Sequence, residues 1–224
     1  MRQISLITLL ACLTIAASSQ SLIPIKYGIK VGLNSSSIST SRIEGVKPTV
    51  NASQIGISAG ACVYIPLSDK WLINAEVLYS QKGASFDYEF THDYEVNQRD
   101  TFNTTNQLTL SYIELNPTIN FKATDKLTLN FGPSVSFLIG EKYIHTPETY
   151  NLLITDKLIE ASTLDIGLNL GLSYFITENF LVDARAYEGF IKTAEVTQPN
   201  KTGASNPAYT LRNRAIVLSL AYLF

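Results

Sequence analysis

The carboxy-terminal stretch, Thr210–Phe224, constrains the fold more than any other part of the chain. From residue 216 onward, alternate positions carry large apolar residues: Ile216, Leu218, Leu220, Tyr222 and Phe224. The positions between them are mostly small, as at Ala215, Ser219 and Ala221. A period of two places these two sets on opposite faces of a β-strand. One large apolar face and one face of small residues predict a strand between hydrocarbon and a confined interior.

The first predicted strand, residues 27–34, alternates in the same way. Tyr27, Ile29, Val31 and Leu33 are apolar, and the residues between them are small or polar. A terminal strand in lipid must find a partner, because each unpaired backbone group costs several kcal/mol there. We therefore expect the first strand to pair with the last and close a barrel.

Further stretches continue this pattern, and one of them changes phase. Alternation predicts strands over residues 54–66, 71–82, 127–139 and 164–174. In the strand that ends at Phe121, the apolar positions are even as far as Tyr112 and odd from Ile113 onward. A bulge near Tyr112, or an upper half that stands clear of the membrane, would explain the change.

The connections differ sharply in length at the two ends of the predicted strands. Short turns rich in Ser, Thr, Asp and Asn are expected at Leu67–Lys70, Thr124–Lys126 and Thr177–Asn179. Long polar connections are expected at residues 35–53, 83–106, 141–161 and 192–209. Short periplasmic turns with long extracellular loops are typical of outer-membrane barrels. The sequence thus predicts an all-β fold, an eight-stranded antiparallel up-and-down transmembrane β-barrel.

The amino terminus predicts export. Arg2 precedes an apolar run that ends at Ala17, which is the layout of a cleavable signal peptide. We expect residues 1–19 to be this signal and residues 20–224 to form a single barrel domain in the outer membrane. A lipoprotein signal ending at Cys12 is the alternative. Cleavage would leave Cys62 without a disulfide partner, as a small inward-facing residue of its strand.

Six charged residues fall on the inward-facing positions: Lys30, Glu76, Glu114, Asp165, Asp183 and Arg185. The interior of an eight-stranded barrel is barely wide enough for side chains, so these charges are expected to pair as a plug. Glu76, Glu114 and Asp183 are the expected counter-ions of Arg185, with Lys30 completing the set. The alternative is a narrow path for protons or ions.

Catalysis and nucleic-acid binding find little support in the sequence. The formal net charge of −2 argues against a nucleic-acid partner. The two histidines, His92 and His145, lie in the predicted loops without a recognisable Ser/His/Asp arrangement or metal-ligand spacing. We therefore expect no catalytic, cofactor-binding or metal site. A lipid-modifying enzyme and a soluble lipocalin-type barrel remain as alternatives.

Four short motifs resemble the PorT-like outer-membrane β-barrel family of the Bacteroidetes. They are residues 27–34 (YGIKVGLN), 112–117 (YIELNP), 131–133 (FGP) and 184–187 (ARAY) with Gly189. The resemblance covers nearly all of the chain after the signal, and it implies a fold and a location without catalytic residues. A role in type IX secretion belongs to one branch and is not implied.

The preferred functional hypothesis is a non-enzymatic outer-membrane barrel with a binding, docking or structural role through its extracellular loops, and the runner-up is a narrow pore. The expected partners are outer-membrane lipid and lipopolysaccharide, and an unidentified protein or glycan at the loops. The barrel-assembly machinery is expected to read Tyr222 and Phe224 as an insertion signal.

Overall fold

A computed structural model describes residues 25–42, 51–95, 98–146, 159–199 and 205–224. The predicted signal peptide, residues 1–19, lies outside these ranges. The described chain forms ten strands: β1 (Lys26–Arg42), β2 (Asn51–Pro66), β3 (Trp71–Glu95), β4 (Gln98–Lys122), β5 (Leu127–Thr146), β6 (Ile159–Ala161), β7 (Leu164–Phe175), β8 (Phe180–Gly189), β9 (Ala194–Pro199) and β10 (Ser205–Leu223). Within these ranges, no helix has the length and apolar character needed to cross a membrane.

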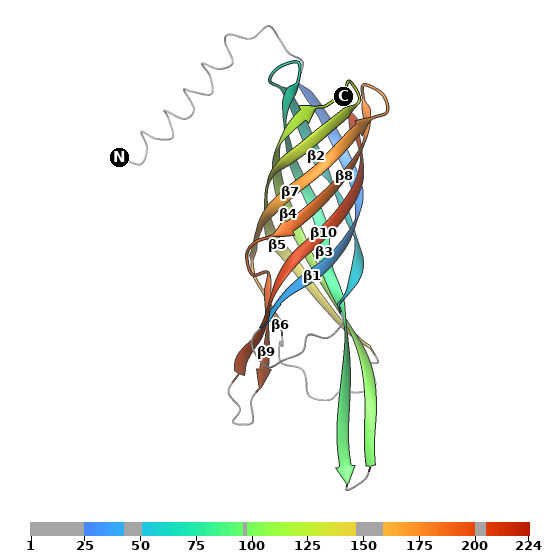
Figure 1. Cartoon of the computed structure of the whole chain (residues 1–224), viewed down its shortest axis with the longest axis vertical. Helices are drawn as coiled ribbons and strands as arrows, with labels where there is room; N and C mark the ends of the chain where they lie inside the picture. The colour runs from blue at the N-terminus through green and yellow to red at the C-terminus, as the bar shows by residue number, and fades with distance from the viewer. Residues whose placement is uncertain (1–24, 43–50, 96–97, 147–158, 200–204) are drawn as a thin grey trace, which may run out of the picture.

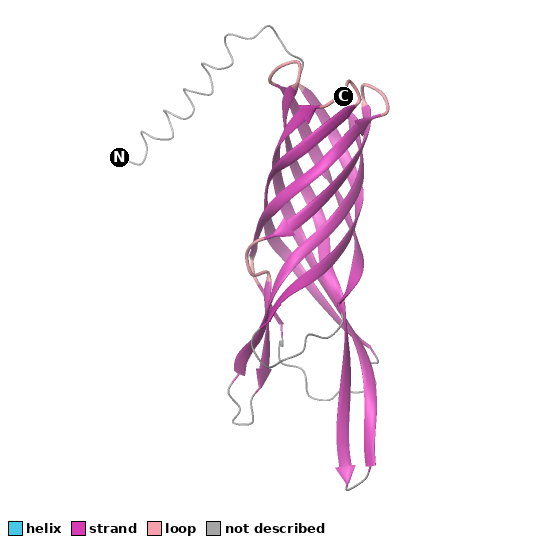
Figure 2. Ribbon diagram, in the orientation of Figure 1, coloured by secondary structure: helices cyan, strands magenta, loops and turns pink. Residues whose placement is uncertain are grey.

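Eight of the strands close into a barrel. They follow the order β1-β2-β3-β4-β5-β7-β8-β10, each antiparallel to its neighbours, and β10 returns to pair with β1. The closing register runs from Gly28 opposite Leu223 to Arg42 opposite Tyr209. Figure 1 shows the tilted strands wrapping around a common axis, and Figure 2 shows that strand accounts for nearly all of the described chain. The predicted eight-stranded barrel and its first-to-last closure are confirmed.

The two remaining strands extend the sheet at the long-connection end. β9 pairs with the beginning of β10, and β6 pairs with β9. The ranges predicted as long loops therefore include residues that belong to strands. β1 continues to Arg42, β5 continues to Thr146, and β3 and β4 pair almost to their tips, at Glu95 and Gln98. The extension of β1, residues 35–42, is almost entirely polar, so the pattern that marks the membrane-spanning strands cannot find it. The extension of β3 does alternate, with Phe86, Tyr88, Phe90 and Tyr94 on one parity, so this part of the strand could have been predicted from the sequence.

The alternation predicted in the sequence sorts side chains between the outside and the inside of the wall. On β10, the outward Ile216 and Leu218 keep 62% and 58% of their surface exposed, whereas Ala215 and Ser219 are buried. β1, β2, β3, β5 and β7 show the same division. The outside of the barrel is therefore a continuous apolar belt, as an outer-membrane span requires.

The phase change in the apolar pattern of β4 is not caused by a bulge in this strand. The register is irregular next to Tyr112, as predicted, but Ser111 pairs with Gly140 and Tyr112 with Leu138, so the extra residue is Ile139 of β5. Leu108, Leu110 and Tyr112 are buried on the same inward face as Glu114. The even positions of β4 thus face inward throughout, and the interior itself becomes apolar toward the long-connection end.

The three short turns are held by their own hydroxyl groups. The Trp71 amide donates to Ser68 Oγ at 3.2 Å, and the Leu127 amide donates to Thr124 Oγ1 at 2.9 Å. The third turn repeats the arrangement, since the Phe180 amide donates to Thr177 Oγ1 at 3.0 Å. The predicted turn chemistry therefore fixes three of the hairpins at this end, which we call the short-turn end.

Candidate functional site: the charged interior of the barrel

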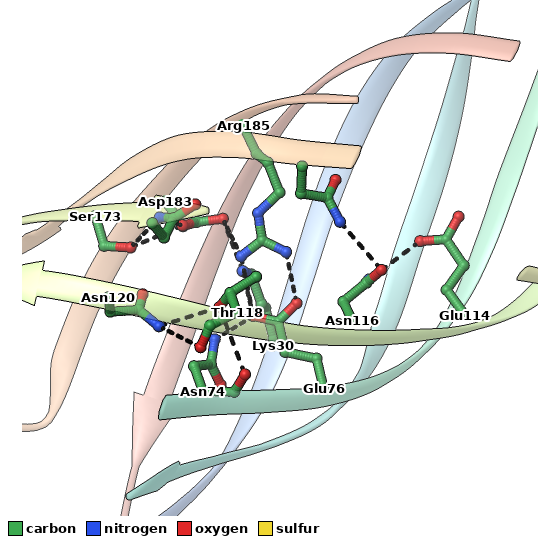
Figure 3. A network of polar contacts seen from close by, with 12 residues as sticks. Lys30, Asn74, Glu76, Glu114, Asn116, Thr118, Asn120, Ser173, Asp183 and Arg185 are labelled. Atoms are coloured by element: carbon green, nitrogen blue, oxygen red, sulfur yellow. Dashed lines mark hydrogen bonds and ion pairs between the residues drawn. The ribbon is translucent and has the colours of Figure 1, made fainter. Parts of the chain in front are cut away.

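The central feature of the interior is a network of four charged side chains from β1, β3 and β8. Lys30 Nζ lies 2.9 Å from Glu76 Oε1 and 2.7 Å from Asp183 Oδ1. Arg185 binds Glu76 with both terminal nitrogens, at 2.8 and 3.1 Å, and its NH2 lies 3.2 Å from Asp183 Oδ1. Figure 3 shows these side chains converging from opposite parts of the wall. Each cation thus pairs with both carboxylates, and each carboxylate pairs with both cations. All four side chains are almost fully buried, so the ion pairs lie in a region of low dielectric constant.

Neutral side chains complete the hydrogen bonding of the two carboxylates. Asn74 Nδ2 donates to Glu76 Oε1 at 2.7 Å. Asp183 Oδ2 accepts from Ser173 Oγ at 2.7 Å and from Asn130 Nδ2 at 3.0 Å. These bonds hold the acids in place and offset part of the cost of desolvating them.

A second cluster surrounds Lys82, closer to the long-connection end. Lys82 Nζ lies 2.7 Å from Glu114 Oε1 and 3.7 Å from Asp165 Oδ2. It also lies 3.6 Å from the centre of the Tyr187 ring, within the range of a cation–π interaction. Asp165 accepts a further hydrogen bond from Asn213 Nδ2 at 2.9 Å.

The structure places all six predicted interior charges inside the barrel, but it divides them differently. Lys30, Glu76, Asp183 and Arg185 form the first cluster, whereas Glu114 and Asp165 belong to the second. Glu114 was predicted as a counter-ion of Arg185; its ion pair is with Lys82 instead. Lys82 is missing from the predicted charge set, although its inward parity on the third strand already indicated it.

Glycines make room for the long side chains that meet in this narrow space. A Cβ atom on Gly171 would lie 2.7 Å from Asn130 Oδ1 and 3.0 Å from Arg185 Cα. A Cβ atom on Gly167 would lie 2.5 Å from the Tyr187 ring, which packs directly over that glycine. A Cβ atom would collide at both positions, so glycine at 171 leaves room for the Asn130 side chain and the backbone of β8, and glycine at 167 leaves room for the Tyr187 ring.

Apolar layers cover the charged clusters at both ends. The layer at the long-connection end consists of Ile38, Ala84, Leu108, Leu110, Tyr112 and Leu211. The layer at the short-turn end consists of Cys62, Tyr64, Leu72, Leu181, Ala221 and Leu223. Cys62 is buried and free, in the inward-facing position predicted for it. The layer at the short-turn end does not fill the whole cross-section, because Asn130 and Ser173, which bind Asp183, and Thr128, which lines the cavity at that end, are buried polar residues.

Two cavities differ in what they can hold. One of about 20 Å³ lies between the charged clusters, beside Lys30, Lys82 and Arg185, and has room for about one water molecule. The other, of about 700 Å³, opens among the three short turns, with Lys26, Lys122 and Lys126 alternating with acidic residues around a partly apolar floor. The smaller cavity is a gap within a packed core, far narrower than a hydrated channel.

The described residues show no arrangement for metal catalysis. No group of three or more His, Cys, Asp or Glu side chains in the described part of the chain is placed to hold a metal ion. The carboxylates of the interior are engaged by Lys30, Lys82 and Arg185 instead. The side chains of His92 and His145 lie outside the described ones, so the prediction that they are not catalytic stays a prediction.

A family model described as outer membrane protein beta-barrel domain matches residues 16–195. The chain belongs to this family. Together with the apolar belt, the match places the protein in the outer membrane as an integral barrel. Among curated proteins, none matches the chain.

The chain is similar to solved outer-membrane proteins at low sequence identity. Neisserial surface protein A is 14% identical, with 88% of this chain and 97% of that chain covered and a TM-score of 0.50. The attachment invasion locus protein Ail of Yersinia pestis, in complex with a heparin analogue, is 11% identical over 90% of this chain and 100% of its own, with a TM-score of 0.44. The outer membrane protease OmpT of Escherichia coli is 10% identical over 92% and 99%, with a TM-score of 0.44. With a TM-score of 0.50, Neisserial surface protein A supports the barrel fold of this chain, and at 14% identity it indicates nothing about its function.

Proposed function

We propose that this protein is a non-enzymatic, non-conducting outer-membrane barrel that presents a β-ribbon for binding or docking outside the cell. The observation that carries the proposal is the pairing of β3 with β4. The pairing of β3 with β2 ends at Phe86, opposite Asn51, and the pairing of β4 with β5 ends at Thr105, opposite Thr146. Beyond these, the described pairs join β3 and β4 only to each other, as far as Glu95 and Gln98. Figure 1 shows this ribbon standing well beyond the wall.

A ribbon of this kind has two outer edges. In the described pairing, residues 87–95 and 98–104 have a strand partner on one side only. Backbone N–H and C=O groups on an open edge are available to an added strand, which is a common mode of peptide recognition. The barrel would then be a rigid base that holds the ribbon away from the membrane.

The interior supports the non-conducting part of the proposal. A pore needs a hydrated path, whereas Lys30, Lys82 and Arg185 are engaged in short ion pairs with buried carboxylates. The apolar layers above and below would add a barrier to any ion that entered the barrel. A packed ion-pair core suits a scaffold better than a channel.

The orientation of the barrel follows the asymmetry of its two ends. Outer-membrane barrels have short periplasmic turns and longer extracellular connections. We therefore infer that the turns at Asp69, Asp125 and Glu178 are periplasmic and that the ribbon is extracellular. Within the family, we further infer a place in the PorT-like branch of the Bacteroidetes, supported by the motifs at residues 27–34, 112–117, 131–133 and 184–187.

Site-specific photo-crosslinking in native membranes tests the binding role. A benzoylphenylalanine at Thr91 or Thr101, which pair with each other in the ribbon, is expected to give a discrete adduct on intact cells. The same residue at Asp125 is the control at the opposite end of the barrel. A variant in which Asn-Gly replaces residues 88–104 keeps a two-residue hairpin. It should fold but fail to co-purify from native membranes the partner that the parent barrel crosslinks. Absence of adducts at both ribbon positions would contradict the proposal.

A further inference from the structure

We propose that the outer wall over β8 is a binding site for a phosphorylated glycolipid of the outer leaflet. One acyl chain would lie in a groove between β7 and β10, and the sugar phosphate would meet Arg212 and Arg214. The site depends on the orientation inferred above, but it does not depend on the binding role of the ribbon.

The groove follows from the registers of three adjacent strands. On β8 the outward positions near the middle of the wall are Ala184 and Ala186. Ala186 lies between Leu170 of β7 and Ile216 of β10. Ala184 lies in the same way between Leu172 and Leu218, one step closer to the short-turn end. Two methyl side chains thus lie between two rows of long aliphatic ones.

The flanking rows rise well above this floor. Leu170 and Ile216 expose 61% and 62% of their surface, which is among the highest values on the apolar belt. Adjacent strands lie about 4.8 Å apart, so the backbones of β7 and β10 are roughly 10 Å apart across β8. This spacing leaves room for one extended hydrocarbon chain above the two alanines, with aliphatic contacts on both sides.

The apolar row of β10 ends in two arginines at the long-connection end. Arg214 and Arg212 occupy the next two outward positions beyond Ile216, and both are exposed. Arg214 Nε donates to Glu188 Oε1 at 2.9 Å, which anchors the side chain at the end of the groove. This bond uses only one of the five N–H donors of the guanidinium group. Arginine binds phosphate oxygens in a bidentate manner, so the groove ends in a charge complementary to a phosphate.

The opposite end of the belt has a different composition. At the short-turn end the outward row of β10 ends with Tyr222 and Phe224, and the Phe224 amide donates a hydrogen bond to the Tyr27 carbonyl of β1. Trp71, at the start of β3, is a further exposed aromatic residue at this end. Aromatic side chains of this kind suit a general membrane interface. The arginine pair therefore marks one end and one sector of the wall. With this end outside the cell, as inferred above, the arginines lie at the headgroups of the outer leaflet, which makes a phosphorylated glycolipid of that leaflet the proposed occupant and binding of a glycerophospholipid an outcome of the test.

Native mass spectrometry of the refolded full barrel in detergent tests this site. The probes are bisphosphorylated lipid A, the same lipid A without its phosphates, phosphatidylglycerol and inorganic phosphate. We expect lipid A to bind at least about tenfold more tightly than each of the other three, which corresponds to one charge-assisted contact. Equal binding of dephosphorylated lipid A, phosphatidylglycerol or phosphate alone would overturn the proposal.

Two variants separate the headgroup contact from the groove. The double change Arg212→Gln and Arg214→Gln should weaken lipid A binding about tenfold, whereas Lys126→Gln, at an exposed short turn, should leave it unchanged. Ala186→Phe should weaken binding by filling the groove, and Ala75→Phe, at an exposed outward position of β3, is its control. Ala186→Leu replaces Ala186→Phe if the larger residue prevents folding, which heat-modifiable gel migration detects. Unchanged affinity in the arginine variant or in the folded groove variant would refute the site.

Discussion

Arg185 illustrates how strongly one buried side chain depends on its partners. It holds Glu76 through two hydrogen bonds and lies close to Asp183, while Lys30 binds both acids from the other side. Removing one member of such a network leaves a buried charge without compensation, which costs more than removing a matched pair. The bidentate contact also requires the planar guanidinium group, which lysine cannot replace.

We therefore predict that Arg185→Ala lowers the free energy of unfolding by about 3–5 kcal/mol. Adding Glu76→Gln should restore part of that loss, because Lys30 keeps Asp183 as its partner. Urea unfolding of the refolded barrel in detergent measures both effects. Arg214→Ala, which removes an exposed ion pair with Glu188, is the control and should change the free energy by no more than about 1 kcal/mol. An Arg185→Ala variant as stable as the parent would contradict the network.

The sequence predicted which residues face inward, because the period of a strand is two and each inward position can be counted from its neighbours. It did not predict which charges meet. Strand tilt decides whether Glu114 lies level with Arg185 or with Lys82, and tilt is a property of the closed barrel rather than of one strand. The inward apolar layer at Leu108 and Leu110 was missed for a related reason, since an apolar inward residue in a sequence looks the same as a lipid-facing one.

At the scale of single elements, β10 closes the barrel by pairing with β1, and the aromatic residues at its end face outward. Tyr222 and Phe224 pack edge to face, with ring centres 5.3 Å apart, and the Phe224 amide donates to the Tyr27 carbonyl at 2.7 Å. Phe224 keeps 69% of its surface exposed. This last residue thus both pairs with β1 and presents an aromatic ring outward.

Deletion of Phe224 is predicted to reduce the amount of folded protein in the outer membrane, because the barrel-assembly machinery would lose the terminal aromatic residue of its signal. Quantitative gels that separate the heat-modifiable folded form measure this amount. Phe131→Ala, which removes an exposed aromatic residue from β5, away from the end of the chain, is the matched control and should have a smaller effect. An undiminished folded fraction without Phe224 would contradict the assignment.

The polar extensions of β1, β3, β4 and β5 show where sequence patterns stop being informative. Inside the membrane one face of each strand must be apolar, which makes the alternation visible. Outside it, both faces can be polar, as in residues 35–42 of β1, and the alternation then disappears. In β3 the alternation continues through Phe86, Tyr88 and Phe90, and only the polar residues around them led to the prediction of a loop. The sequence therefore predicted the spanning segments and the turns well, and it described the paired extensions as loops.

Cysteine labelling tests the orientation of these elements. Single cysteines at Thr91 in the ribbon and at Asp69 in a short turn are introduced into a Cys62→Ala background. A membrane-impermeant maleimide on intact cells is expected to label position 91 only, and to label position 69 after the outer membrane is permeabilised. The parent protein should remain unlabelled while folded, because Cys62 is buried. Labelling at position 69 on intact cells would reverse the orientation.

At the scale of the whole molecule, the barrel combines an apolar outer belt with an interior that is packed in its middle and opens into a cavity of about 700 Å³ among the short turns. The two charged clusters occupy the middle, and apolar layers cover them at both ends. The cavity between the clusters, about 20 Å³, has room for roughly one water molecule. Such a molecule suits the proposed role of a rigid scaffold for the ribbon, and the packed middle leads us to expect that ions do not pass through it.

Single-channel recording of the refolded, unmutated barrel in a planar bilayer tests this closed interior most directly. The packed clusters and the two apolar layers predict no steady conductance at moderate voltage, in low or high salt. Protein from the same preparation must show the heat-modifiable folded form, so that silence in the recording is not a failure to insert. A stable conductance that scales with salt concentration would contradict the account and identify the protein as a narrow pore.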